Sequence, residues 1–229
     1  MKRELMTLAA TVGLTMTANA AIIAQPAGSE DPFTLTQDAL GESAIVTSSG
    51  GIVEDWSNTL ATLQDNSLGT GGTAGASSSI GVTSATSITY TFDTSGSNSR
   101  GYDLTKIQTY AGWNYIYGIG RSNQGYAVEL TFVGGATTTL LNKDSWATDP
   151  IYWTRVTLVN DADPGVALLA TGVKSVTFTN FENATANHGD VGAVAYREID
   201  IYGTTTVPEP AVASLLLLGA AAFSLRRRN

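Results

Sequence analysis

Several short segments of this chain alternate apolar and hydroxyl-bearing residues with a period of two. In residues 87–92, Ile88, Tyr90 and Phe92 fall on one side of an extended chain, and serine and threonine fall on the other. Because successive side chains of a strand point to opposite faces of its sheet, this pattern predicts a strand with one buried face. Similar short segments, separated by turn-forming residues, are 126–132, 154–158, 175–179 and 198–203.

Few segments depart from this pattern. Residues 43–47 add a short strand, and the spacing of Trp56, Leu60 and Leu63 predicts one or two helical turns within residues 54–63. Residues 69–79 are rich in Gly, Ser, Thr and Ala, which predicts a loop. At least seven strands joined by turns, with no repeat of fixed period, predict an all-β fold: a single antiparallel, jelly-roll-like β-sandwich.

Two residue counts exclude whole classes of site. The chain has no cysteine, which rules out disulfides, thiolate metal sites, iron–sulfur clusters and cysteine nucleophiles. It has one histidine, His188, so no site that needs two histidines can form. His188 lies in an Asn-His-Gly-Asp segment and is better interpreted as a turn residue than as a metal ligand.

The N-terminus has the layout of a secretory signal peptide. Lys2 and Arg3 precede an apolar run over residues 5–16, and a small-x-small site ends at Ala20. We therefore predict that residues 1–20 are a signal peptide, removed by signal peptidase. The alternative is a short buried N-terminal helix.

The C-terminus carries a second address. Pro208, Glu209 and Pro210 precede an apolar run over residues 211–225, and the chain then reads Arg226, Arg227, Arg228 and Asn229. The prolines favour an extended, protease-accessible segment. The apolar run is short for a permanent span but long enough to enter a membrane transiently, and the arginines favour a cytoplasmic end.

Residues 207–229 resemble the PEP-CTERM sorting signal, in which a Pro-Glu-Pro motif precedes an apolar helix and a basic cluster. The resemblance implies a Gram-negative-type host, processing by the membrane protease exosortase, and association with exopolysaccharide or biofilm matrix. A plain single-span anchor is the alternative. In either case residues 21–206 form one exported domain at the cell surface or outside the cell.

That domain is strongly acidic. Residues 21–206 contain seven basic and eighteen acidic residues, a net charge of −11. Such a surface repels nucleic acid and anionic lipid, and the chain has no basic patch with interleaved aromatics. Neutral glycans or divalent cations are more compatible partners.

The order of landmarks after residue 80 resembles the galactose-binding-like (discoidin-like) jelly roll. An I-x-x-Y strand (107–110) leads to a loop with Trp113, Arg121 precedes the next strand, and the last strand ends E-I-x-I-Y-G (198–203). The resemblance covers residues 80–203. Before it, only residues 63–66 stand where such domains carry a Leu-x-Asp-Gly turn, so the usual metal loop is not matched.

Two aromatic clusters are candidate glycan-binding residues, because aromatic rings stack on sugar faces and a guanidinium can bond neighbouring hydroxyls. The first is Trp113, Tyr115, Tyr117 and Arg121, among glycines at 112, 118 and 120. Its alternative places Trp113 in the core and pairs Arg121 with a carboxylate. The second is Trp146 and Trp153, with Tyr152 near Asp144 and Asp149, and its alternative is a hydrophobic cap over a long loop.

Two acidic loops make a structural calcium ion possible: Asp161 with Asp163, and Asp65 with Asn66. Calcium needs six to eight converging oxygen ligands, whereas a β-turn also favours acids at this spacing. We therefore assign no metal ligand and no other cofactor.

No nucleophile elbow, phosphate-binding loop or paired-histidine motif is present. We predict no catalytic residue, although a glycosidase carboxylate pair remains open. The leading hypothesis is a non-catalytic surface or matrix protein that binds extracellular glycan. The rivals are a purely structural matrix component and an exported glycan-active hydrolase.

Overall fold

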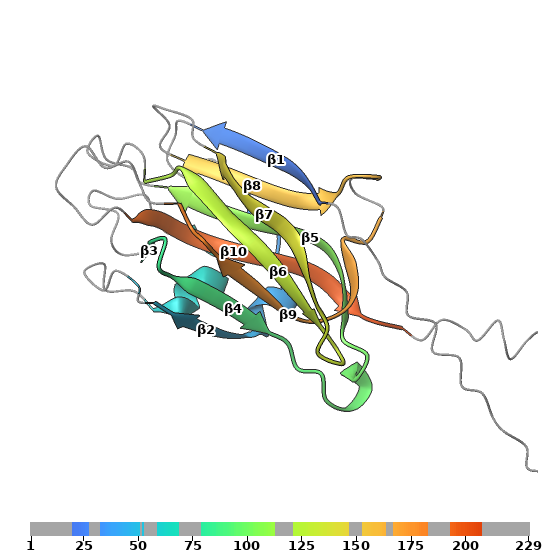
Figure 1. The fold of residues 1–229 in the computed structure, drawn as a ribbon. Coiled ribbons are helices and arrows are strands. Elements are labelled where there is room, and N and C mark those ends of the chain that lie inside the picture. The colour runs from blue at the N-terminus through green and yellow to red at the C-terminus, as the bar shows by residue number, and fades with distance from the viewer. Residues whose placement is uncertain are drawn as a thin grey trace, which may run out of the picture.

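The computed structural model describes residues 20–27, 33–50, 52, 59–68, 79–112, 121–146, 153–163, 167–182 and 193–207. Regular structure within these ranges is almost entirely β-strand (Figure 1). The strands are β1 (Ala20–Ala27), β2 (Ile45–Ser49), β3 (Ile80–Val82), β4 (Ser87–Thr91), β5 (Tyr102–Gly112), β6 (Gln124–Phe132), β7 (Thr137–Trp146), β8 (Trp153–Asn160), β9 (Ala170–Thr179) and β10 (Val194–Thr205). The helical elements are α1 (Ala39–Glu42), η2 (Leu60–Gln64) and η4 (Gly96–Asn98).

The strands form two antiparallel layers. Pairing gives the order β1-β8-β5-β10-β3 in the first layer and β7-β6-β9-β4-β2 in the second. The layers join at one corner, where Tyr102 of β5 pairs with Val173 of β9 and Leu104 pairs with Ala170. The chain is therefore an all-β sandwich, as the sequence pattern predicts.

A glycine permits this corner. Gly101 has φ of +81°, and a Cβ there would lie 2.7 Å from the carbonyl carbon of Gly172. Both the left-handed conformation and the close approach of the two backbones favour a residue without a side chain. The corner thus depends on glycine where β5 begins and β9 passes.

The core lies between the layers and follows the alternation in the sequence. Ile88 and Tyr90 of β4, and Val128 and Leu130 of β6, are buried, whereas Glu129 between the latter pair is exposed. Tyr126 and Phe178 meet edge-to-face, with ring centroids 5.5 Å apart. Burial of these side chains is the main source of stability in such a fold.

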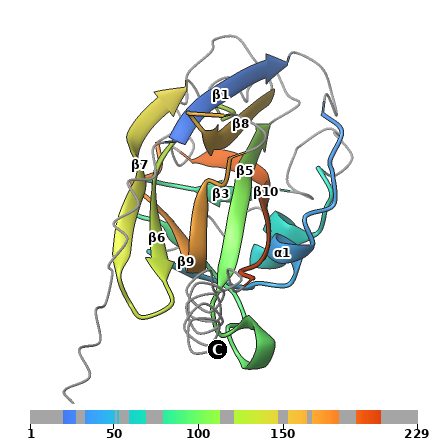
Figure 2. The same ribbon diagram turned by 90° about the vertical axis from the view of Figure 1, so that its right-hand side faces the viewer.

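Strand β10 is buried on both faces from Val194 to Ile201. Its inner face meets the second layer, and its outer side is covered by residues 33–44, which include α1 (Figure 2). Leu40 of α1 packs against Gly203, where a Cβ would lie 2.9 Å from Leu40 Cδ2. We call residues Phe33–Ala44 the strap.

The sequence pattern locates most of these strands but misses three. Strands β2, β4, β5, β6, β8, β9 and β10 overlap the predicted segments, whereas β1, β3 and β7 were not anticipated. The expected helical turns appear only as η2, since residues 53–58 lie outside the described ranges.

Both address segments lie almost wholly outside the described residues. Of residues 1–20 only Ala20 is described, at the start of β1, and residues 208–229 are not described. Within the part of the chain that the structure covers, no helix has the length and apolarity that a membrane span requires. The domain limits 1–20, 21–206 and 207–229 therefore remain predictions.

Candidate functional site

Strand pairing brings the strand ends that flank the two predicted aromatic segments to one end of the sandwich. Gly112, the last residue of β5, pairs with Trp153, the first residue of β8. Gln124, the first residue of β6, pairs with Trp146, the last residue of β7. These four strand ends lie at one end of the sandwich, which we call the Gly112 end.

Contacts between the layers confirm that these strand ends are neighbours. The amide nitrogen Nε2 of Gln124 donates to the carbonyl oxygens of Thr154 (2.8 Å) and Thr109 (3.1 Å). The backbone of Ala195, at the start of β10, donates to the Arg121 carbonyl oxygen at 2.8 Å. The end of β5 and the starts of β6, β8 and β10 thus lie together at this end.

Most of the predicted site residues are outside the described part of the chain. This holds for Trp113, Tyr115 and Tyr117, and for the side chain of Trp146, whose backbone ends β7. Tyr152 and His188 are also outside it. Trp113 directly follows Gly112, the last described residue of β5.

Trp153 is a core residue, which corrects the expectation that its ring is exposed. Its side chain is 0% exposed and packs with Leu68, Tyr110 and residues 33 and 35 of the strap. A Cβ at Gly112 would lie 2.1 Å from Trp153 Cε3, so the ring lies directly on the backbone of β5. A ring covered in this way cannot stack on a sugar, and the hydrophobic-cap alternative describes it.

Arg121 is also less accessible than expected. Its residue is 7% exposed, and its backbone carbonyl ties it to the start of β10. In this conformation the side chain presents little surface to an external ligand. Arg121 therefore belongs to the base of the Gly112 end rather than to an open platform.

Arg197 of β10 also belongs to this base, although no sequence pattern predicts it there. It sits where the pairing of β10 with β5 shifts register between Tyr196 and Glu198, an irregularity that redirects a side chain. Its Nε donates to the Gly112 carbonyl oxygen at 2.9 Å, and its guanidinium carbon lies 5.1 Å from the Trp153 ring centroid. Burial lowers its pKa to about 10. The signal available in the sequence was an arginine directly after the apolar run Val194–Tyr196, just before the predicted strand 198–203.

A buried polar network stiffens the same end. Thr109 donates through Oγ1 to Gln124 Oε1 at 2.6 Å, and the Tyr126 hydroxyl lies 2.8 Å from the same Oγ1. Thr154 Oγ1 also donates to the carbonyl of Ser122. Because buried polar groups are costly unless they are paired, this network holds β5, β6 and β8 in one arrangement.

A second cluster consists of buried carboxyl groups where the strap meets β10: Asp38 of the strap and Glu198 and Asp200 of β10, which are 2%, 0% and 0% exposed. Burial raises the pKa of Asp38 to about 7, of Asp200 to about 6 and of Glu198 to about 10. The sequence signal was the alternation of acids with isoleucines in residues 198–201. Because these groups are sealed from solvent, they do not form an accessible glycosidase pair.

The two acidic loops considered as calcium sites differ in their surroundings. Asp161 and Asp163 lie in an exposed turn after β8. The Asp65 side chain lies close to Glu198, and burial raises the pKa of Asp65. Asn66 has φ of +56°. Among the residues that the structure describes, no three His, Cys, Asp or Glu side chains gather in a way that could hold a metal ion.

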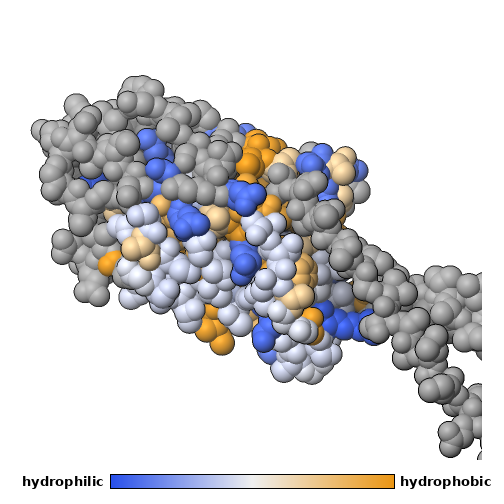
Figure 3. Space-filling model, viewed as in Figure 1, coloured by the Kyte–Doolittle hydropathy of each residue, from blue (hydrophilic) through white to orange (hydrophobic). Residues whose placement is uncertain are grey.

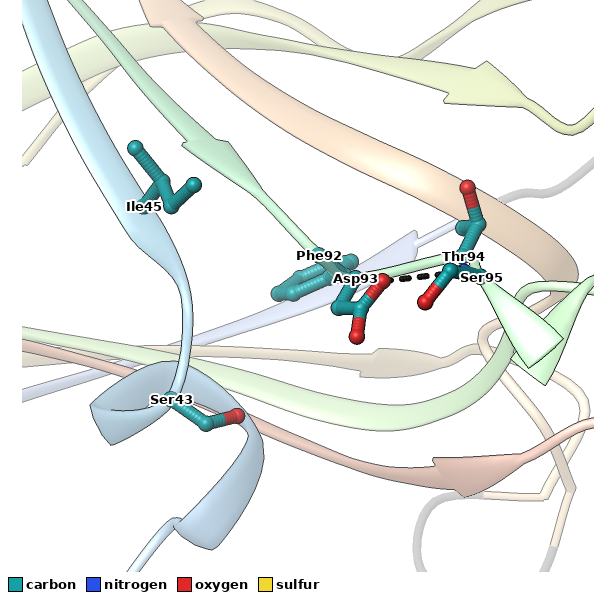
Figure 4. A pocket seen from close by; sticks show the side chains of 6 residues that line it. All are labelled: Ser43, Ile45, Phe92, Asp93, Thr94 and Ser95. Carbon is teal, nitrogen blue, oxygen red and sulfur yellow. Dashed lines mark hydrogen bonds between the residues drawn. The ribbon is translucent and has the colours of Figure 1, made fainter. Parts of the chain in front are cut away.

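An open pocket of about 580 Å³ lies near the start of β5, at the end of the sandwich opposite to Gly112 (Figure 4). Its walls are the start of β2 on one side and the loop that follows β4 on the other. Ile45 in its wall is 70% exposed, whereas Phe92 is 3% exposed and offers no free ring. On the face shown in Figure 3, apolar side chains gather in a narrow band near the top centre, bordered by hydrophilic ones. Neither feature makes an aromatic platform.

No protein-family model and no curated protein sequence matches this chain. Among solved structures, the family 32 carbohydrate-binding module of Clostridium perfringens NanJ, in complex with galactose, matches with a TM-score of 0.42 and 10% identity over 71% of this chain and 96% of that one. The module CpGH89CBM32-5 of the same organism, in complex with GalNAc-β-1,3-galactose, matches with a TM-score of 0.40 and 14% identity over 71% of this chain and 98% of that one. At these values the similarity does not assign a ligand to this chain.

Proposed function

We propose that this chain is an exported, non-catalytic surface or matrix protein that binds extracellular glycan at the Gly112 end. The observation that carries the proposal is the pairing of Gly112 with Trp153 and of Gln124 with Trp146. Trp113, Tyr115 and Tyr117 follow Gly112 in the chain, and the other aromatic-bearing stretch runs from Trp146 to Trp153. A sugar-stacking site requires aromatic side chains close together, and both aromatic-bearing stretches are joined in sequence to these paired strand ends.

The rigid base supports this use of the end. Arg197, Trp153 and Gln124 hold the strand termini with buried hydrogen bonds and ring packing. Binding loops carried by a rigid scaffold lose less conformational entropy when they engage a ligand. The acidic surface, with a net charge of −11 over residues 21–206, favours a neutral glycan over an anionic one.

The two ends of the chain deliver the domain to that ligand. Residues 1–20 direct export, and residues 207–229 direct recognition by exosortase while residues 211–225 enter the membrane transiently. Exopolysaccharide at the cell surface or in a biofilm is then the glycan within reach. Export and glycan binding are separable parts of the proposal, since either can fail without the other.

A glycan array probed with residues 21–206 tests the binding part. We expect retention on a subset of neutral glycans, and loss of the signal when Tyr115 and Tyr117 are both replaced by alanine. Ile45→Ala is the matched control, because it shortens an exposed side chain at the opposite end of the sandwich. Equal signals from both variants, or no signal from the parent domain, would refute glycan binding at the Gly112 end.

A purely structural role in the matrix is the second candidate. The burial of Trp153 and Arg121 favours it, since two of the predicted ligand residues serve the core instead. Under this role the array is blank and the tyrosine substitutions act on stability alone.

A further inference from the structure

The strap is tied to β10 by a side chain that would ordinarily serve its own helix. Asp38 occupies the N-cap position of α1, yet its carboxylate makes no capping hydrogen bond. Instead Asp38 Oδ2 accepts a 2.6 Å hydrogen bond from the backbone N–H of Ile201. Strand β3 pairs with β10 only at Val194–Tyr196, so this N–H lies beyond the reach of β3.

The space for this contact is kept open by a glycine. A Cβ at Gly41 would lie 1.9 Å from Asp38 Oδ2 and 3.1 Å from the Ile201 nitrogen. Two further contacts close the strap: the Tyr202 hydroxyl donates to the Thr36 carbonyl at 2.8 Å, and Phe33 lies 5.9 Å from the Tyr110 ring. The strap therefore covers both the edge of β10 and the outer aromatic face at Tyr110 and Trp153.

The strap lies over a region in which acidic side chains outnumber basic ones. Besides Asp38 and Asp200, the titratable and charged side chains that influence this region are Glu42 of α1, Asp65 after η2, Tyr90 of β4, Lys106 and Tyr110 of β5, Arg155 of β8, and Glu198 and Tyr202 of β10. Lys106 Nζ lies 3.7 Å from the centre of the Tyr202 ring, and Asp200 lies close enough to influence its titration. The acids outnumber the two cations.

The geometry favours neutral carboxyl groups. Asp38 Oδ1 and Asp200 Oδ1 are buried without a hydrogen-bond partner. A carboxylate with an unpartnered oxygen in a buried site is far more costly than the corresponding acid. The second oxygen of Asp38 accepts from Ile201 in either protonation state, so protonation removes the charge and keeps the bond.

Titration of these groups falls near neutral pH. Burial is the largest cause of the raised pKa of Asp38, and the charges of Asp200 and Glu42 add to it. For Asp200, burial outweighs the opposing effects of Tyr202, Lys106 and Tyr110. Ionisation of both groups is therefore expected as the pH rises from about 5 to about 8.

We propose that the strap Phe33–Ala44 is a proton-held cover, closed while Asp38 and Asp200 are neutral and loosened when both ionise, which uncovers Tyr110 and Trp153. Ionisation places two like charges in a buried site, and release of the strap to solvent relieves this cost. The aromatic face becomes accessible at neutral to alkaline pH and is covered in acid. The proposal stands whether or not the Gly112 end binds glycan.

The amide of Ile201 reports directly on the strap. Its hydrogen exchange, measured by NMR in residues 21–206 and corrected for the intrinsic pH dependence, gives a protection factor at each pH. We expect this factor to fall at least about tenfold between pH 5 and pH 8, because one pKa unit corresponds to a factor of ten. Amides in the β6–β9 ladder, remote from the strap, should show no comparable fall.

Matched variants separate charge from contact. Asp38→Asn keeps an acceptor for the Ile201 N–H but cannot ionise, so its protection factor should vary by less than threefold over the same range. Asp161→Asn removes the same charge from an exposed turn and should behave as the parent domain. If Asp38→Asn fails to fold, Asp200→Asn replaces it. The protection factor of Ile201 in that variant should likewise vary by less than threefold over this pH range.

Two results would overturn the proposal. One is a parent protection factor at Ile201 that stays constant from pH 5 to pH 8. The other is a fall of equal size in the parent domain and in the folded Asn variant, which would show that the opening does not depend on the strap carboxyl groups.

Discussion

The indole ring of Trp153 lies directly on the backbone of Gly112, so closely that a Cβ at position 112 would be 2.1 Å from Cε3. Arg197 completes the arrangement by bonding the Gly112 carbonyl and lying over the ring. Three residues from β5, β8 and β10 thus form one rigid unit. The aromatic segment that starts at Trp113 is attached to it.

This contact predicts that Gly112→Ala is destabilising, although glycine is usually the weaker choice in a strand. The added methyl must displace the ring or the backbone, and overpacking of this kind costs about 1–3 kcal/mol. Urea unfolding gives the free energy directly. In a Trp153→Leu background the cost of Gly112→Ala should largely vanish, and an undiminished cost there would contradict a clash with the ring.

Trp153 itself should behave as a core residue. Trp153→Ala removes a fully buried ring and is expected to lower the free energy of unfolding by about 3–5 kcal/mol. Thermal or urea unfolding measures the change. A loss below about 1 kcal/mol would mean that the ring is exposed in solution and would return Trp153 to the list of ligand candidates.

The buried carboxyl groups predict an unusual dependence of stability on pH. Since the pKa values of Asp38 and Asp200 are raised on folding, the folded state binds more protons than the unfolded state. The contribution of these two groups to the free energy of unfolding is fully present below about pH 4. It is lost as the pH rises through about 6 to 7.

The urea midpoint of residues 21–206 should therefore be higher at pH 5 than at pH 8, and Asp38→Asn should reduce the difference. Asp161→Asn is the control, because that side chain lies in an exposed turn. A midpoint that rises from pH 5 to pH 8 would contradict the assignment.

The sequence predicts the interior of this fold better than its edges. Strands such as β4 and β6 bury one face, so Ile88, Tyr90 and Val128 appear as a clear alternation. Strand β1 lies at a sheet edge and β3 has three residues, so neither gives a long periodic signal. Strand β10 is buried on both faces because the strap covers its outer side. This covering is a tertiary contact, which the local sequence pattern does not reveal.

The candidate site was only partly accessible to the same reasoning. Trp113, Tyr115 and Tyr117 lie outside the described residues, so their expected loop position stays a prediction. Whether a ring is exposed depends on what covers it, which the sequence pattern does not contain. Trp153 is covered by segments remote in sequence, such as Phe33 and Arg197. The strap carboxyl groups were missed because Asp38 and Asp200 are 162 positions apart in the chain and meet only through tertiary packing.

The address segments predict dual processing in the native host. Cleavage after Ala20 and loss of Arg226–Arg228 should both appear in the intact mass of the protein recovered from the cell surface or medium. Replacing Pro208 and Pro210 by alanine should block the second event and leave the first unchanged. Recovery of the unprocessed chain from the cytoplasm would contradict export.

The most direct test of the central claim is a calorimetric titration of residues 21–206 with a glycan selected on the array. We predict that Tyr115→Ala and Tyr117→Ala each weaken binding by about 0.5–2 kcal/mol, the range for aromatic contacts at partly exposed sites. Neither should change the free energy of unfolding by more than about 0.5 kcal/mol. Unchanged affinity in both variants, together with a loss of several kcal/mol in stability, would contradict glycan binding at the Gly112 end and support the structural role.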